Sequence, residues 1–227
     1  MKRIFALVLA LMLAFSLAAC GEQAKPDAPL PEDPASSHEV GAADPSALQL
    51  EALNIEFVIG ERDAAELMAL RAELPPLLTD KLADEGVTVQ NIVITFGASA
   101  EATMQALQSS SVDAAFLPSE ALSGFRTRLI AVENASVPAG EYFPDIDFSE
   151  VDGVDAVSPI YENAVALSAD APDALRDAFS AALAALCADV DGSAALQHYG
   201  SASYLVSGDL GALFVPLNTC LTHAAQE

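Results

Sequence analysis

From residue 48 onwards, short apolar runs alternate with longer amphipathic stretches. Runs of four to ten residues rich in Val, Ile, Leu and Phe predict strands, and apolar residues at helical spacing predict helices between them. The expected strands are 53–59, 87–96, 112–117, 129–132, 164–167, 203–206 and 212–217, and the expected helices are 62–84, 99–107, 170–190 and 194–199. Strands joined by crossover helices predict an α/β fold: a mostly parallel sheet with helices on both faces.

Two of these helices have further local signals. The stretch 62–84 carries a leucine stripe, but Pro75 and Pro76 are expected to kink or split it, because proline cannot donate a backbone hydrogen bond. The stretch 170–190 has the clearest apolar stripe in the chain, and Asp191-Gly192 is expected to end it.

The first twenty residues have the pattern of a secretory signal. Lys2 and Arg3 precede an apolar core too short for a comfortable membrane span, and Leu17-Ala18-Ala19-Cys20 follows. This segment resembles a bacterial lipobox, which implies cleavage after residue 19, lipidation of Cys20 and attachment outside the cytoplasmic membrane. An ordinary signal peptide, with a cysteine near its cleavage site, is the alternative.

Residues 20–47 lack apolar periodicity and are rich in proline and acidic residues, which predicts an extended tether. The folded part is expected to be residues 48–227. Outside the signal, no run of about 18 apolar residues occurs, so the lipid at Cys20 would be the only attachment to the membrane.

Charge narrows the range of partners. The chain has 33 acidic residues against nine Lys and Arg, a formal net charge of −24, which becomes −26 without Lys2 and Arg3. Such a surface lacks the cations that phosphate backbones require, so nucleic-acid partners are excluded. The 52% hydrophobic content excludes a disordered polymer.

Catalytic and metal signatures are missing from the sequence. The three histidines are scattered, and no zinc-protease, redox, nucleophile-elbow or phosphate-loop motif occurs, which indicates a protein that is not an enzyme and uses no cofactor. The acidic run from Asp145 to Asp155 lacks the spacing of a calcium loop, so an exposed acidic loop is preferred to a metal site.

Three candidate ligand-binding residues follow the expected strands. Arg62, Ser99 and Ser119 stand where strands end and helices begin, and in α/β sheets small polar or anionic ligands bind at these ends. Each has a structural alternative: both serines are common helix N-caps, and Arg62 could be a solvated charge.

Cys187 and Cys220 are left once Cys20 is assigned to lipid. Outside the cytoplasm they could form a disulfide, worth roughly 3 to 4 kcal/mol in the chain-entropy description. Separate buried thiols are the alternative, since Cys187 follows the apolar stripe of its helix.

The order of these phrases resembles a known family. A lipobox and tether are followed by LNIEFVIGERD, VQNIVITFGASAEATMQALQ and SVDAAFLPSEAL, and later by SPIYENAVALSADAPDALRDAFSAALAAL. This arrangement is similar to the phosphonate/sulfonate-type, transferrin-like solute-binding lipoproteins of ABC importers. The resemblance implies a periplasmic-binding-protein type II-like lobe, and by position it adds Tyr161 to Arg62, Ser99 and Ser119 as a ligand-facing residue.

The chain departs from that family between its outgoing and returning strands. Members insert a whole second lobe there, whereas this chain has only residues 122–158, which is too short for one. The second lobe is therefore expected to be reduced or absent. Two functions stay open: a solute-binding protein that delivers a small anionic, phosphonate-like solute to an ABC permease, and a single-lobe relic or adaptor that binds a protein partner at the membrane surface.

Overall fold

The computed structural model describes residues 47–122, 127–206 and 210–226. The predicted signal peptide (1–19), the lipidation site Cys20 and the tether up to residue 46 lie outside these residues and stay predictions.

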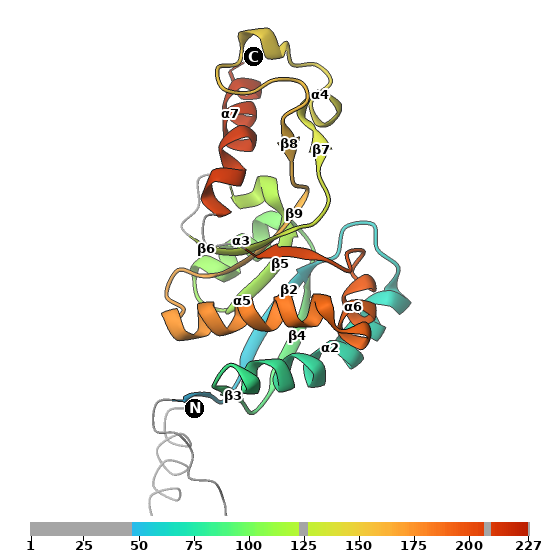
Figure 1. Ribbon diagram of the computed structural model, residues 1–227, viewed down its shortest axis with the longest axis vertical. Coiled ribbons are helices and arrows are strands. Elements are labelled where there is room, and N and C mark those ends of the chain that lie inside the picture. The colour runs from blue at the N-terminus through green and yellow to red at the C-terminus, as the bar shows by residue number, and fades with distance from the viewer. Residues whose placement is uncertain (1–46, 123–126, 207–209, 227) are drawn as a thin grey trace, which may run out of the picture. The chain divides into compact units, whose positions relative to one another are not determined.

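The described residues alternate strands with helices, as the sequence pattern predicts (Figure 1). The strands are β1 Leu48–Leu50, β2 Leu53–Val58, β3 Val87–Val89, β4 Ile92–Gly97, β5 Ala114–Pro118, β6 Thr127–Glu133, β7 Val137–Pro138, β8 Pro159–Ile160, β9 Asn163–Ser168 and β10 Tyr204–Val206. The α-helices are α2 Ala64–Asp84, α3 Ala100–Gln108, α4 Ala139–Tyr142, α5 Asp173–Ala188, α6 Val190–Gln197 and α7 Val215–Ala224. The 3₁₀ turns are η2 Ser119–Leu122, η3 Phe148–Glu150 and η4 Leu210–Phe214.

The main sheet has six strands in the order β10-β6-β9-β5-β2-β4. β4 and β5 both pair parallel to β2, whereas β9 lies antiparallel between β5 and β6, and β10 is antiparallel to β6. Four strands therefore run in one direction and two in the other. This confirms the predicted α/β fold with a mixed, mostly parallel sheet.

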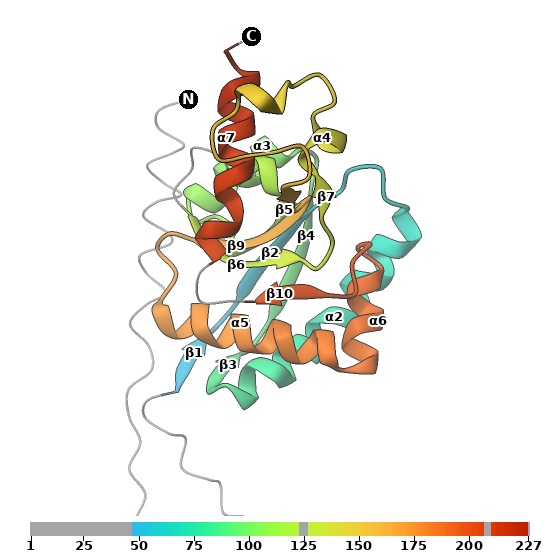
Figure 2. The same cartoon turned by 45° about the horizontal axis from the view of Figure 1, so that its top comes forward.

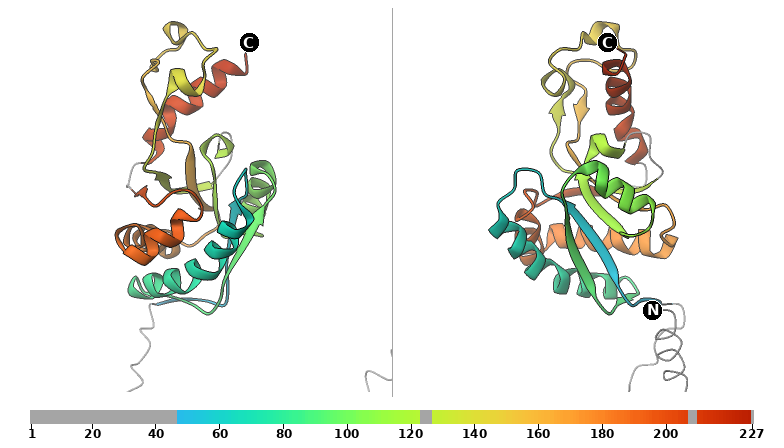
Figure 3. Two further views of the ribbon diagram at one scale, coloured as in Figure 1. Left: turned by 90° about the vertical axis from the view of Figure 1, so that its right-hand side faces the viewer. Right: turned by 180° about the vertical axis from the view of Figure 1, so that it is seen from behind.

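Helices cover both faces of the sheet, because successive strand residues point to opposite sides. Helices α2, α5 and α6 pack on one face, against the side chains of Ile55, Phe57 and Phe116. Helix α3 packs on the other face, against Ala115 and Leu117. Figure 3 shows this second face in its right-hand view, with α5 behind the sheet.

An aromatic cluster lies at the centre of the larger core. The rings of Phe57 and Phe116 stack with centroids 4.2 Å apart, and Tyr199 meets Phe57 edge-on at 4.8 Å. The hydroxyl of Tyr199 donates towards the carbonyl oxygens of Val58 and Phe116, at 3.1 and 3.0 Å. Tyr199, two residues after the end of α6, is thus joined to the ends of the central strands β2 and β5.

A second hydrophobic cluster lies beyond the sheet, in what we call the distal subdomain (residues 134–162 and 210–226). Most of its buried residues come from the segment between β6 and β9 and from the C-terminal segment, and Val132 of β6 and Ala164 of β9 join the cluster to the sheet. β7 and β8 form a two-stranded ladder there, and α7 contacts β8 and η2. The distal subdomain includes the segment between β6 and β9, where the family resemblance places a second lobe (Figure 1).

Two predictions about helices were wrong. The expected strand 212–217 is instead η4 followed by α7, with Pro216 in the first turn, a position where proline is well tolerated. Of the kink or split expected at Pro75 and Pro76, the split does not occur, since α2 is continuous over 21 residues. Asp191-Gly192 does not end α5. It lies in α6, because the Asp189 carboxylate accepts from the backbone N–H groups of Asp191 and Gly192 and so starts a new helix.

Among the described residues, no single helix has both the length and the apolar composition to cross a membrane. Helices α5 and α6 have this length and composition only when they are taken together, and the pair is bent by 97°.

Candidate ligand-binding edge

The carboxyl ends of β2, β4 and β5 meet at one edge of the sheet, on the side of the distal subdomain (Figure 2). Val58 at the end of β2 lies opposite Gly97 at the end of β4, and Pro118 ends β5 one strand away. The residues that follow these ends were the candidates from sequence. We call this region the carboxyl edge.

Arg62 is fixed at the carboxyl edge by backbone carbonyls. Its Nε donates to the Tyr199 carbonyl at 2.5 Å, and its Nη1 donates to the carbonyls of Val58 and Ile59, both at 3.2 Å. The guanidinium carbon lies 3.7 Å from the centroid of the Tyr199 ring, a stacked cation–π contact. Arg62 is therefore not a freely solvated charge. The two protons on its Nη2 take part in none of these hydrogen bonds.

Glu133 introduces a second charge near this edge. It is 9% exposed at the end of β6, and its carboxylate accepts a hydrogen bond from the side-chain amide of Asn163. Burial first, and then the charges of Tyr199 and Glu133, raise the pKa of Tyr204 well above its ordinary value, whereas Arg62 acts in the opposite direction. Burial likewise raises the pKa of Tyr199 to about 12, so both phenols stay protonated at neutral pH.

Sequence reasoning missed these four residues (Tyr199, Tyr204, Glu133 and Asn163). One signal was available: an acid directly after the apolar run LIAV is unusual in a buried strand. Nothing local indicates that Tyr199 lies under Arg62, which is 137 residues away along the chain.

Ser119 is the most deeply buried of the predicted site residues. It begins η2 directly after β5, and its side chain is 1% exposed. Its backbone N–H donates to the Glu162 carbonyl at 2.8 Å, but its hydroxyl has no hydrogen-bond partner among the described residues. Such a hydroxyl costs free energy unless a further group satisfies it. It is not the helix cap that the alternative reading expected.

Ser99, in contrast, is a helix N-cap. Its hydroxyl accepts from the backbone N–H of Ala102 at 3.2 Å, at the start of the nine-residue helix α3, and the side chain is exposed. Behind it, the Thr103 hydroxyl donates to the Glu56 carboxylate at 2.6 Å, close to Gly97. The structural alternative for Ser99 therefore accounts for its side chain.

Tyr161 lies two residues before β9 and is half-buried against the distal hydrophobic cluster. Close to it in sequence, the Glu162 carbonyl joins β9 to Ser119. A further hydrogen bond joins the distal subdomain to η2: the Tyr142 hydroxyl donates to the Glu120 carboxylate at 2.8 Å. Burial and this hydrogen bond raise the pKa of Tyr142, so the phenol remains a donor.

The disulfide candidate is corrected by the structure. Cys187 and Cys220 are both free. Cys187 packs against the larger core and accepts from the Tyr204 N–H at 3.3 Å, whereas Cys220 is buried in the distal cluster. Burial raises the pKa of both thiols. The alternative of separate buried thiols is the one observed.

No metal cluster accompanies the carboxyl edge. Within the part of the chain that the structure describes, no group of three or more His, Cys, Asp or Glu side chains could hold a metal ion. In the acidic run, Asp147 caps η3 by accepting from Ser149, and Asp155 accepts from Val157. These carboxylates bind their own loop.

No protein-family model and no curated protein matches the chain. Solved structures do match. XAC2383 from Xanthomonas citri bound to ATP has a TM-score of 0.52 at 10% identity, over 78% of this chain and 98% of that chain.

Two further matches have lower scores. A binding protein component of an ABC phosphonate transporter from Pseudomonas aeruginosa has a TM-score of 0.49 at 10% identity, over 78% of this chain and 87% of that one. PhnD1 from Prochlorococcus marinus in complex with methylphosphonate has a TM-score of 0.45 at 7% identity, over 74% and 99%. At such identities the likeness concerns the fold alone. The comparison thus shows an α/β fold similar to that of XAC2383.

Proposed function

We propose that this protein is a lipid-anchored solute-binding protein of an ABC importer, and that it binds a small anionic, phosphonate-like solute at the carboxyl edge. The observation that supports this most directly is the Ser119 hydroxyl, buried and without a partner among the described residues where β5 ends. The structure with a similar fold, XAC2383, is bound to ATP, a small molecule that carries phosphate groups, which is consistent with an anionic ligand.

In this proposal the carboxyl edge binds the solute and breaks no bond in it. An oxyanion of the proposed solute accepts one hydrogen bond from the Ser119 hydroxyl and another from Arg62 Nη2. The Nε and Nη1 groups of Arg62 already hold the guanidinium in place. A pre-positioned cation loses little side-chain entropy on binding. No residue needs to act as acid, base or nucleophile, so the proposed protein is not an enzyme.

Weak affinity is expected. Glu133 lies near the same edge, and a net charge of −26 on the mature chain slows the approach of an anion. The distal subdomain is also small, so the solute is less enclosed than between two full lobes. We expect dissociation constants of roughly 100 μM or weaker, within a range up to about 10 mM.

The test is calorimetry of the full chain in detergent with methylphosphonate, phosphate and methanesulfonate. Ser119→Ala should abolish binding without lowering stability, because alanine fits the same space and removes a hydroxyl that lacks a partner. Ser109→Ala, an exposed position at the opposite end of α3, is the matched control and should bind as the wild type does. Equal binding by Ser119→Ala would overturn the proposed site.

The anchor has its own test. Wild-type protein should partition into the detergent phase and carry the added mass of lipid, whereas Cys20→Ala should do neither. Identical partitioning and mass for both proteins would reject the lipid attachment and favour the ordinary signal peptide.

A second candidate is the adaptor that binds a protein partner. One observation favours it: four surface hollows formed by the described residues are all lined by residues other than Arg62, Ser99, Ser119 and Tyr161. If none of the three anions binds at 10 mM, the adaptor becomes the better account.

A further inference from the structure

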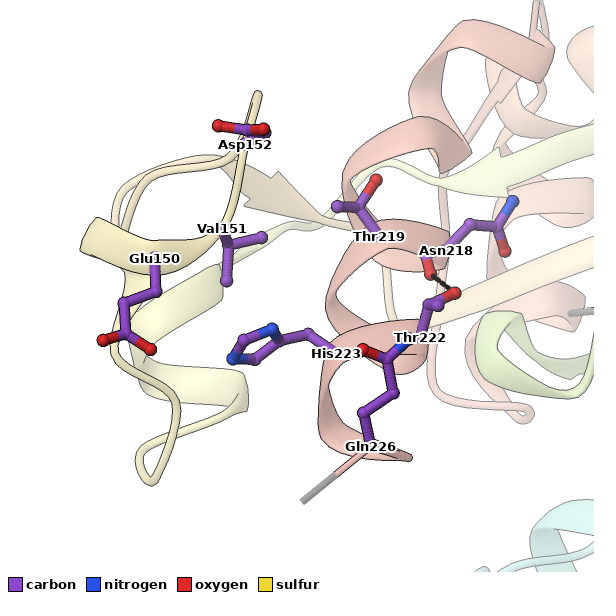
Figure 4. A pocket seen from close by; sticks show the side chains of 8 residues that line it. All are labelled: Glu150, Val151, Asp152, Asn218, Thr219, Thr222, His223 and Gln226. Atoms are coloured by element: carbon purple, nitrogen blue, oxygen red, sulfur yellow. Dashed lines mark hydrogen bonds between the residues drawn. The ribbon is translucent and has the colours of Figure 1, made fainter.

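A polar hollow lies within the distal subdomain, apart from the carboxyl edge. It has a volume of about 360 Å³ and is bounded by the loop after η3 and by α7. Figure 4 shows its lining side chains, with Val151 directed from the loop towards the helix. The lining residues are Glu150, Val151, Asp152, Asn218, Thr219, Thr222, His223 and Gln226.

His223 reaches from α7 towards the loop (Figure 4), and the other polar side chains of the α7 wall present mainly hydrogen-bond acceptors. The hydroxyl protons of Thr219 and Thr222 are donated to the carbonyls of Val215 and Asn218, both at 2.8 Å. Each hydroxyl oxygen is therefore left with lone pairs as its remaining hydrogen-bonding capacity. The amides of Asn218 and Gln226 can turn a carbonyl oxygen to a ligand, so this wall suits a ligand rich in N–H donors.

The loop wall adds two negative charges on either side of an apolar residue. Glu150 and Asp152 flank Val151 in sequence, and Figure 4 shows their carboxylates on opposite sides of its side chain. Val151 is 7% exposed and belongs to the distal hydrophobic cluster. Two anionic groups separated by an apolar surface match two cationic groups separated by methylene groups.

The charge of the whole subdomain favours the same ligand. Residues 134–162 contain seven acidic side chains, and residues 134–162 and 210–226 together contain no Lys or Arg. A potential of one sign concentrates cations near the surface. A metal ion fits less well than an organic cation, because the described residues offer no group of three metal-ligating side chains.

We propose that the hollow between the η3 loop and α7 binds a linear diamine. One ammonium group pairs with Glu150 and the other with Asp152, while the methylene chain lies on Val151 and the acceptors of α7 receive the remaining N–H groups. The site is separate from the proposed solute site, and it requires neither the lipid anchor nor an ABC permease.

The experiment is a titration of the full chain with 1,4-diaminobutane and 1,5-diaminopentane, followed by amide NMR and calorimetry at low and high salt. Shifts should concentrate at residues 150–152 and 218–226. The monoamine 1-aminobutane should bind at least about fivefold more weakly, since it can form one ion pair only. Glu150→Gln and Asp152→Asn should each weaken diamine binding by about fivefold, and the double variant should abolish it.

Controls separate a site from general attraction. Glu141→Gln with Asp145→Asn removes the same charge from exposed positions outside the hollow and should leave diamine affinity within twofold of wild type. Ser119→Ala should also leave it unchanged, which distinguishes this result from any failure of the solute site. The proposal is overturned if the control pair weakens binding as much as the hollow variants do, if monoamine and diamine bind alike, or if Ca²⁺ displaces the diamine at equal concentration.

Discussion

The main α/β lobe and the distal subdomain are built in contrasting ways. In the lobe, long helices bury leucine stripes against a six-stranded sheet, and the stacked Phe57 and Phe116 rings lie at its centre. In the distal subdomain, two-residue strands and short turns surround a much smaller cluster, and its carboxylates have no Lys or Arg beside them in sequence. The first arrangement specifies a fold, whereas the second leaves polar surface available for recognition.

The largest predicted effect concerns the core of the lobe. Phe57→Ala removes a ring that is fully buried and stacked, so the free energy of unfolding should fall by about 3 to 5 kcal/mol. Phe148→Ala, at a half-buried ring of the distal cluster, should cost about 1 kcal/mol. Urea denaturation followed by circular dichroism measures both. Equal losses would show that the two regions are equally packed, contrary to the comparison.

The next effect concerns the fixed guanidinium at the carboxyl edge. Arg62→Met removes the side-chain donor from the carbonyls of Tyr199, Val58 and Ile59, and it removes the stacked contact with the Tyr199 ring. The Val58 and Ile59 carbonyls keep a second donor, so a loss of roughly 2 kcal/mol is expected. Arg71→Met, at an exposed position on the helix α2 that follows Arg62, should change stability by less than about 0.5 kcal/mol. If the two variants are equally stable, Arg62 is not structural and its candidacy as a mobile ligand group improves.

A smaller global effect is expected in the distal subdomain. Leu217 is 2% exposed, but its cluster can open without unfolding the sheet, so Leu217→Ala should lower global stability by less than about 2 kcal/mol. Hydrogen exchange should instead become faster in α7 and in residues 151–160, while β2 keeps its protection. A uniform loss of protection across both regions would mean that they unfold as one unit.

The smallest effect is a pH dependence within the lobe. His198 follows α6 and contacts the carboxylates of Glu66 and Glu73 on α2, at 3.1 Å for Glu73, and the Glu66 hydrogen bond raises the His198 pKa. A raised pKa means that protonated His198 stabilises the fold. This contribution is complete below the ordinary histidine pKa of about 6.5 and disappears as the pH rises through the raised value.

Melting temperatures between pH 5 and pH 9 test this contribution. Wild-type protein should lose more stability across that range than His198→Gln or Glu66→Gln. Parallel curves for all three proteins would contradict the proposed link between α2 and α6.

The lobe could be predicted from sequence because its elements are long and periodic. The stripe of Leu175, Phe179 and Leu186 on α5 fits a helix only. The apolar run of β5 is bounded by Asp113 and Ser119, and the run of β2 is followed closely by Gly60. The antiparallel insertion of β9 between β5 and β6 could not be predicted, since nothing in a single apolar strand states which neighbours it will have.

The distal subdomain could not be predicted for a different reason. Its cluster joins short segments separated by about fifty residues, and none of these segments is long enough to show the apolar periodicity of a helix or a strand. The run before Leu217 is short and apolar throughout, so it fits a strand or a buried helix equally well. The Arg62 contact with Tyr199 likewise depends on the tertiary fold, whereas Ser99 as a cap was among the local expectations.

The central position of β9 has a consequence for the order of folding. β5 and β6 are made first, but their native partner on the facing edges is β9, which ends at Ser168. Until that residue has been synthesised and released, both edges expose unpaired backbone groups, and such edges promote aggregation. A newly made chain must therefore remain unfolded, or be protected by other proteins, until about three quarters of it is available, and ribosome-bound chains that stop before β9 should not acquire the protease resistance of the complete lobe.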